Sequence, residues 1–169
     1  KANNWVFKED PRKRGWRKVV ASPKPLGIMN KKVIKDLVKH GHIVIAVGGG
    51  GIPVYWHDDT KYLEAIEAVV DKDLASSLLA REIKADRFYI ITDVPKVFIN
   101  FNKPDQKALD HLTAAEARKY LDAGEFPAGS MGPKILAAIE FVESSGNEAI
   151  ITCEADIEKE NCGTRITLQ

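Results

Sequence analysis

The sequence lacks the features that mark membrane, secreted and zinc-binding proteins. Its longest run of purely aliphatic residues, Ile43–Val47, is far shorter than the roughly 20 apolar residues of a bilayer span. Lys1–Asp10 is charged and polar, unlike a secretory signal. The two cysteines, Cys153 and Cys162, and the four histidines show no zinc spacing, and no disulfide can be deduced from sequence. We therefore expect a reduced, cytoplasmic protein with no metal site of its own.

The sequence also has almost no excess of one charge sign. The 169 residues include 25 Lys and Arg against 24 Asp and Glu, for a net charge of +1. Proteins that bind nucleic acids or anionic membranes carry a basic excess, so we expect neither as a partner. Hydrophobic residues make up 44% of the chain, which is typical of one globular domain. Any anion binding must come from a few well-placed groups.

Segments with strand and helix patterns alternate along most of the chain. Strands are expected at Trp16–Ala21, His42–Val47, Ile52–Val54, Glu67–Val70, Phe88–Ile91, Val97–Asn100, Glu148–Cys153 and Thr164–Leu168. Helices are expected at Asn30–His40, Lys72–Lys84, Thr113–Leu121 and Pro133–Gly146. The β-branched run His42–Val47 is typical of a strand buried on both faces. The alternation predicts a three-layer αβα sandwich with a mainly parallel sheet, in which the last two strands form an antiparallel edge.

Glycine-rich or acidic segments follow three successive predicted strands. Gly48–Gly51 ends the first, Asp71–Asp73 the second and Thr92–Asp93 the third. In open α/β sheets, ligands bind outside the carboxyl ends of the strands. The three segments are therefore expected to meet at one site.

The four glycines, Gly48, Gly49, Gly50 and Gly51, allow a backbone to approach a ligand closely and its N–H groups to bind an anion. No Gly-Lys-Ser/Thr follows, so the run is no Walker loop. Ile52–Pro53 takes the place of the helix start in the dinucleotide motif. The ordinary alternative is a sharp turn in a tightly packed connection.

Two lysines are candidates for binding a phosphoryl group. Lys72 lies between Asp71 and Asp73, whose carboxylates can hold ammonium groups, although an aspartate here is also a common helix N-cap. Lys134 follows a glycine-rich turn at the start of a helix, where the dipole disfavours a cation unless an anion lies beside it. Its ordinary alternative is a solvated surface lysine. Trp16, Trp56 and Phe101 are candidates for stacking on a base, or are core or interface residues.

Taken together, these stretches resemble carbamate kinases of the amino acid kinase superfamily. The resemblance covers nearly the whole chain, in the family's order. It is carried by Phe7–Asp10, Gly15–Pro25, Gly48–Val54, Glu67–Ser76, Ile91–Val94, Ile99–Gln106, Gly129–Lys134 and Gly163–Ile166. Where the family usually has tyrosine, this chain has Phe101, so stacking remains without the phenol hydrogen bond.

The resemblance implies that residues 28–169 form an αβα domain that binds ATP or ADP. It implies that residues 1–27 return from a protruding subdomain and an N-terminal half that have no counterpart in this sequence. The implied catalytic residues are Lys72, Asp73, Lys134 and Asp71, with Gly48–Gly51 near the reacting centre. The implied nucleotide-binding residues are Thr92, Asp93, Val94, Phe101, Met131, Gly132 and Pro133.

The implied activity is reversible phosphoryl transfer between carbamoyl phosphate and ADP, giving ATP and carbamate, in arginine and carbamoyl phosphate catabolism. Mg²⁺ would be carried by the nucleotide, and the complete enzyme would be a homodimer. Two alternatives stay open. The chain is a nucleotide-binding fragment that is inactive alone, or it belongs to another superfamily kinase that acts on a carboxylate.

Overall fold

A four-stranded sheet forms the centre of the fold, in a computed structural model that describes residues 5–10, 13, 15–48 and 51–169. Its strand order is β5 (Phe88–Thr92), β9 (Ala149–Cys153), β10 (Thr164–Thr167) and β8 (His111–Thr113). β5 pairs with β9 and β10 with β8 in parallel, whereas β9 and β10 are antiparallel. The sheet is therefore mainly parallel, as predicted.

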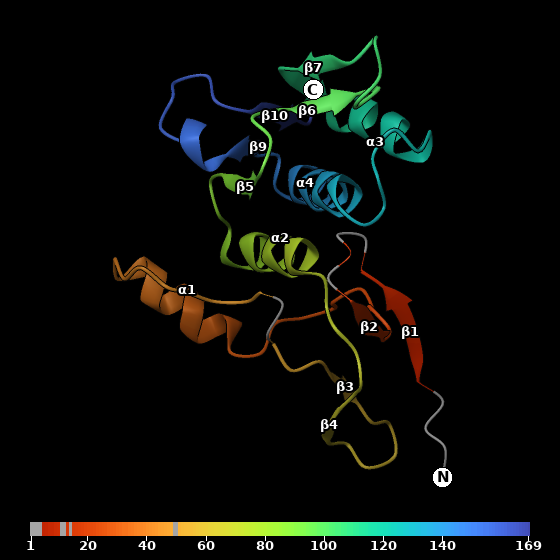
Figure 1. The fold of residues 1–169 in the computed structure, drawn as a ribbon. Helices are drawn as coiled ribbons and strands as arrows, with labels where there is room; N and C mark the ends of the chain where they lie inside the picture. Colours follow the sequence, from red (N-terminus) through yellow and green to blue (C-terminus); the bar gives the residue numbers. More distant parts are fainter. Residues whose placement is uncertain (1–4, 11–12, 14, 49–50) are drawn as a thin grey trace.

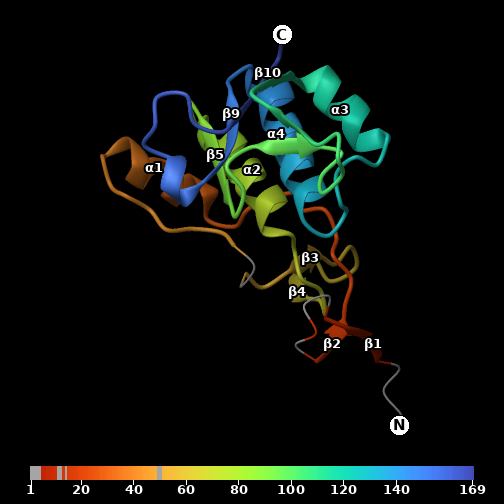
Figure 2. The same cartoon turned by 45° about the horizontal axis from the view of Figure 1, so that its top comes forward.

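Three helices pack on this sheet (Figures 1 and 2). They are α2 (Lys72–Ile83), α3 (Ala114–Asp122) and α4 (Met131–Ser145). α4 lies between the other two and contacts β5, β9 and β10, while α1 (Lys31–Lys39) packs against α2. Among the described residues, no helix is both long enough and apolar enough to cross a membrane.

Short hairpins make up the remaining strands. They are β1 (Val6–Glu9) with β2 (Trp16–Val19), β3 (Val54–Trp56) with β4 (Leu63–Ala65), and β6 (Val97–Ile99) with β7 (Lys107–Leu109), all antiparallel. A 3₁₀ turn, η1 (Glu154–Asp156), follows β9. The first two hairpins lie at the end of the molecule remote from the four-stranded sheet (Figure 1).

The four predicted helices are confirmed. Their local sequence patterns, such as capping residues and apolar faces, match the contacts that they make in the fold. Thr113 and Glu116 form the reciprocal capping box that opens α3. The apolar face of α4 supplies Ile135, Ile139 and Val142 to the core, each at 0% exposure. The last two strands, β9 and β10, pair antiparallel as predicted, but they occupy the centre of the sheet between β5 and β8 and do not form its edge.

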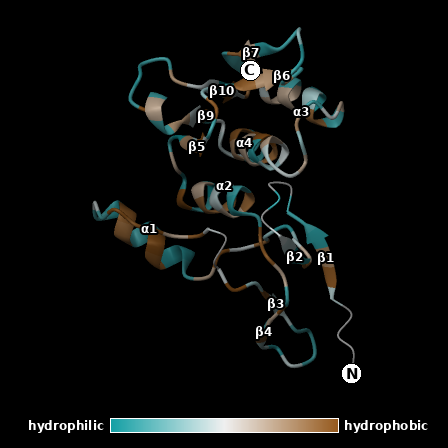
Figure 3. Cartoon of the chain, viewed as in Figure 1, coloured by the Kyte–Doolittle hydropathy of each residue, from teal (hydrophilic) through white to brown (hydrophobic). Residues whose placement is uncertain are grey.

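Two predicted strands are corrected. His42–Val47 has no strand structure, and Ile43 and Ile45 are both 100% exposed instead of buried on both faces. Glu67–Val70 forms only one isolated bridge, from Ala68 to Ala21. A strand needs a neighbour for its backbone groups, and no described strand lies beside His42–Val47. Figure 3 shows apolar residues in brown along α1 and the connection before α2, outside the core around α4.

Thr164 ties the β6–β7 hairpin to the sheet. Its side chain is 0% exposed, its Oγ1 accepts a hydrogen bond from the Val97 amide at 2.8 Å, and it donates one to the Leu109 carbonyl. Because Phe101 lies in the loop of this hairpin, between β6 and β7, the hydroxyl also helps to position one wall of the site described below.

Thr164→Val keeps the shape of the side chain but leaves a buried amide and a buried carbonyl without this partner. We expect the free energy of unfolding, measured by urea denaturation, to fall by about 2 kcal/mol or more. The control is Thr60→Val, at an exposed position in the turn between β3 and β4, which should change it by about 0.5 kcal/mol at most. Equal midpoints for the two variants would contradict this account of Thr164.

Candidate functional site

Two adjoining cavities lie where β5 ends and where α2 and α4 begin. The aromatic pocket, of about 210 Å³, is lined by Thr92, Asp93, Val94, Phe98, Phe101, Glu125, Phe126, Pro127, Ser130, Met131 and Lys134. The charged hollow, of about 410 Å³, is lined by Asp71, Lys72, Asp73, Ile91, Thr92, Asp93, Gly129, Ser130, Pro133 and Lys134. Thr92, Asp93, Ser130 and Lys134 line both. The two cavities are therefore parts of one site.

The start of α2 is organised by Asp71. Its Oδ1 accepts hydrogen bonds from the backbone N–H groups of Asp73 at 2.8 Å and Leu74 at 3.0 Å. This is the N-cap arrangement that satisfies the first free amides of a helix. Asp71 thus has the structural role that its position suggested, and it presents Asp73 to the hollow from the first turn.

A buried ion pair joins α2 to α4 across the hollow. Lys134 Nζ donates a hydrogen bond to Asp73 Oδ2 at 2.8 Å, and both residues are only 9% exposed. The ordinary alternative of a solvated lysine is therefore wrong for Lys134. A buried ammonium group is costly unless a carboxylate compensates it, and Asp73 does so here.

Lys72 reaches the same carboxylate from the solvent side. Its Nζ lies 3.6 Å from Asp73 Oδ2, and its side chain is 62% exposed. Asp73 therefore has one buried and one exposed ammonium group within 4 Å. The sequence analysis predicted that both lysines belong to one site. In the structure, both ammonium groups lie within 4 Å of the same atom, Asp73 Oδ2.

The start of α4 explains the glycine-rich turn before it. The amide of Gly132 donates to the Pro127 carbonyl at 2.9 Å, and a Cβ on Gly132 would lie 3.1 Å from that oxygen. Glycine is therefore favoured there by packing, and Gly132 itself lines neither cavity. Its neighbours do: Met131 lines the aromatic pocket and Pro133 the charged hollow. The dipoles of α2 and α4 both place their positive ends at the hollow, which favours an anion.

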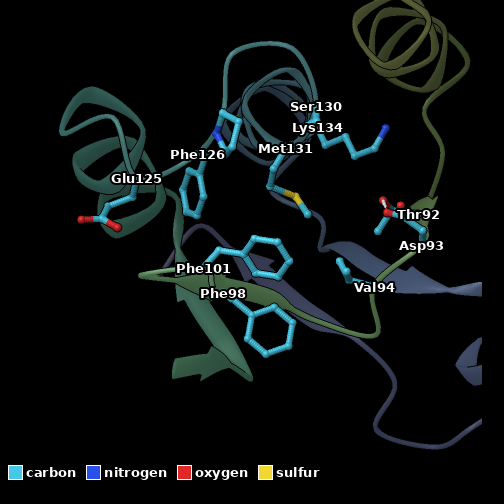
Figure 4. A pocket seen from close by; sticks show the side chains of 11 residues that line it. Thr92, Asp93, Val94, Phe98, Phe101, Glu125, Phe126, Ser130, Met131 and Lys134 are labelled. Carbon is cyan, nitrogen blue, oxygen red and sulfur yellow. Dashed lines mark hydrogen bonds between the residues drawn. The ribbon is translucent and has the colours of Figure 1, made fainter. Parts of the chain in front are cut away.

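The aromatic pocket is built by the segment after β5 and by the connection before α4 (Figure 4). Phe98 and Phe101 have ring centroids 5.9 Å apart, and Met131 points toward Phe101 from the opposite side. Glu125 accepts a hydrogen bond from the Asn100 amide at 3.2 Å, which links the two segments. A flat apolar group fits between these side chains.

Thr92, Asp93 and Val94 lie at the junction of the two cavities. The Thr92 hydroxyl donates to Asp93 Oδ1 at 3.1 Å, which fixes the turn at the end of β5. Figure 4 shows the Lys134 side chain extending from α4 on the same side of the pocket as this turn. An elongated ligand with a flat apolar end and an anionic end would therefore run from the aromatic pocket past this turn into the charged hollow.

Some sequence candidates do not reach the site. Trp16, on β2, and Trp56, on β3, line neither cavity and are 72% and 56% exposed. Gly48 and Gly51 also line neither cavity, and Gly49 and Gly50 lie outside the described residues. Of the three aromatic candidates, only Phe101 is in the site.

The sequence argument also missed several lining residues, namely Phe98, Glu125, Phe126, Pro127, Ser130, Ile91 and Gly129. Phe98 had a usable signal, because it lies three residues before Phe101 in the same segment. Ser130 and Gly129 lie in the motif that ends at Lys134. Glu125 and Phe126 follow the end of α3, where nothing in the local pattern indicates a ligand.

Comparison with known proteins identifies the family of this chain. Residues 7–153 match the model of the amino acid kinase family. The carbamate kinase of Thermoplasma volcanium is 52% identical over 152 residues, which are 90% of this chain and 48% of that protein. The carbamate kinase-like protein YahI of Escherichia coli is 51% identical over 153 residues, with the same shares. The chain thus spans about half the length of these curated relatives.

The solved structures agree in fold. Carbamate kinase from Giardia lamblia bound to AMP-PNP superposes with a TM-score of 0.86 and 43% identity, over 97% of this chain and 52% of that one. N-acetylglutamate synthase from Neisseria gonorrhoeae, at 15% identity and a TM-score of 0.61, shares the fold alone. Since the family model matches most of its residues, the chain belongs to the amino acid kinase family.

Proposed function

We propose that this chain is the nucleotide-binding part of a carbamate kinase-type phosphotransferase, which transfers a phosphoryl group reversibly between carbamoyl phosphate and ADP to give ATP and carbamate. The observation that carries the proposal is the buried Lys134–Asp73 pair in the charged hollow, from which Lys134 also reaches the lining of the aromatic pocket. Similarity to proteins named carbamate kinase supports the choice of substrate.

The nucleotide would bind with its base in the aromatic pocket and its phosphates in the charged hollow. Phe98, Phe101 and Met131 would contact the base, because aromatic and apolar side chains favour stacking on its faces. Thr92, Asp93 and Val94 would lie along the adenosine, and Pro133 would lie where the phosphates enter the hollow. AMP-PNP bound to the Giardia lamblia relative is consistent with this assignment.

Phosphoryl transfer depends mostly on alignment and on neutralising the charge of the transferred group. Lys134, held in place by Asp73, would contact the nucleotide phosphates and the group in transit. Lys72, whose side chain is 62% exposed, is free to move onto an incoming phosphoryl group while Asp73 keeps it nearby. Asp73 orients both lysines, and Asp71 fixes the helix turn that carries Asp73.

Mg²⁺ would enter this site with the nucleotide. Among the described residues no group of three or more potential ligands could hold a metal ion, and Asp71 and Asp73 already accept hydrogen bonds from the start of α2 and from Lys134. The nucleotide phosphates would therefore supply most of its ligands. When bound, the ion would neutralise phosphate charge. We propose no further role for it.

Turnover would require more polypeptide than this chain contains. Its relatives are about twice as long, and the apolar run His42–Val47 lies unpaired with Ile43 and Ile45 fully exposed. We propose that further polypeptide covers this run, holds carbamate and brings Gly48–Gly51 to the reacting centre. Residues 1–27 would connect to that part, and residues 28–169 would bind the nucleotide.

The remaining assignments rest on the same resemblance. The complete enzyme would be a homodimer in the cytoplasm, where the thiols of Cys153 and Cys162 stay reduced, and would serve arginine and carbamoyl phosphate catabolism. The alternative substrate is a carboxylate, as in other members of the family. Assaying the complete protein with carbamate and a set of amino acid carboxylates would decide between them.

The first prediction concerns Lys134. In the complete protein, Lys134→Met should lower turnover by about 100-fold or more, the loss seen when one electrostatic stabiliser of a transition state is removed. In this chain alone, calorimetric titration should show weaker ADP binding and unchanged adenosine binding. Lys159→Met, which changes an exposed lysine outside both cavities, is the control. Normal turnover in the Lys134 variant would remove this lysine from the mechanism.

The second prediction concerns the base. Phe101→Ala should weaken the binding of ADP and of adenosine by the same factor, roughly tenfold, because stacking on a base contributes about 1–3 kcal/mol. Fluorescence competition with a labelled nucleotide measures both affinities. The control, Tyr62→Ala, removes an aromatic side chain that is 73% exposed and lines neither cavity, and it should change neither affinity. A loss confined to ADP would place the base elsewhere.

The third prediction separates nucleotide binding from turnover. This chain alone, given ADP and carbamoyl phosphate, should bind ADP without forming ATP, because the groups that hold carbamate are proposed to lie in the further polypeptide. A luciferase assay detects the ATP, and the complete protein is the positive control. ATP formation by the chain alone would show that the further polypeptide is dispensable.

A further inference from the structure

Three polar contacts follow one another along the interface between α2 and α4. The ion pair of Asp73 and Lys134 is the first, at the site. The second joins the Ser77 hydroxyl to the Ala137 carbonyl, and the third joins Arg81 to Glu140. The partners are spaced four residues apart on α2 and three apart on α4, so each contact lies about one turn farther from the site.

The second contact is buried and crosses between the helices. Ser77 is 0% exposed, and its Oγ donates to the carbonyl of Ala137, also 0% exposed, at 2.7 Å. A serine inside a helix usually returns its hydroxyl to a carbonyl of its own helix. Here the small side chains of Ser77 and Ala137 allow the helices to approach closely enough for the hydroxyl to reach the neighbouring backbone. A carbonyl oxygen can accept two hydrogen bonds, so α4 keeps its own.

The stiffness of the three contacts differs. Lys134 and Arg81 have long flexible side chains, so their contacts alone leave the relative position of the two helices loosely defined and weaken as their partners shift. Arg81 Nη2 lies 3.3 Å from Glu140 Oε2, and Arg81 is 23% exposed at its side chain. The Ser77 contact instead joins a hydroxyl one bond from Cβ directly to a backbone carbonyl. A sliding movement of α4 along α2 would therefore break the Ser77 contact before either of the others.

We propose that Ser77 is a positioning residue for phosphoryl transfer: its bond to the Ala137 carbonyl fixes how far α4 lies along α2, and thereby holds Lys134 against Asp73. Ser77 lines neither cavity and would touch no substrate. The inference deepens the proposed function, because its effect on the reaction rests on the role proposed for Lys134.

The first test needs no ligand. The coupling between Asp73 and Lys134 is measured in this chain by urea unfolding of Asp73→Asn, Lys134→Met and the double variant. The cycle is then repeated with Ser77→Ala present throughout. Expressed as a ratio of equilibrium constants, the coupling should fall roughly fivefold, within the range for one hydrogen bond. An unchanged coupling overturns the proposal.

The second test reads the effect on nucleotide. Ser77→Ala should lower the affinity for ADP roughly fivefold and leave the affinity for adenosine within about twofold of the unaltered chain, because only ADP brings phosphates to Lys134. In the Lys134→Met background, Ser77→Ala should have no further effect on ADP. Ser144→Ala, at an exposed position on α4, is the control and should change neither affinity.

The outcomes separate the two proposals. Equal weakening of ADP and adenosine, or an undiminished loss of ADP affinity in the Lys134→Met background, overturns the positioning role and leaves the proposed function standing. Failure of the unaltered chain to bind ADP counts against the proposed function, and the unfolding cycle then still decides whether Ser77 holds the ion pair.

Discussion

The buried pair of Lys134 and Asp73 is the constraint on which the site depends. The ammonium group lies in the first turn of a helix, where the dipole opposes it, and it is almost completely removed from water. The carboxylate on the neighbouring helix compensates for both effects, at 2.8 Å. Breaking such a pair leaves an uncompensated buried charge, so α2 and α4 must begin side by side for the fold to tolerate this lysine.

The pair also determines what the site can bind. Lys134 lines both the aromatic pocket and the charged hollow, and Asp73 lines the charged hollow alone. The core behind it, centred on α4 and β9, is fully buried, so the helix starts are presented from a rigid base. The apolar surface around α1 and Ile43 is exposed, which supports the proposal that further polypeptide covers it.

Local signals made the helices and the charged hollow predictable. Asp71 and Asp73 open a helix, and Lys134 follows a glycine-rich turn into another. The strand-end rule held for Thr92–Asp93, which follow β5, whereas the segments before Gly48 and Asp71 are not strands of the sheet. The aromatic pocket was only partly predictable, because Phe126 and Glu125 come from a connection with no distinctive pattern. His42–Val47 has the composition of a buried strand, but pairing is a nonlocal property. In this fold nothing described pairs with it, so composition alone gave the wrong answer.

The most direct measurement is nitrogen-15 NMR of the Lys134 side-chain ammonium in this chain, assigned with the Lys134→Met variant. The account predicts slow hydrogen exchange in the free chain, because the group is buried against Asp73, and a change in its resonance when ADP is added but not when adenosine is added. A rapidly exchanging ammonium that responds to neither ligand would contradict it.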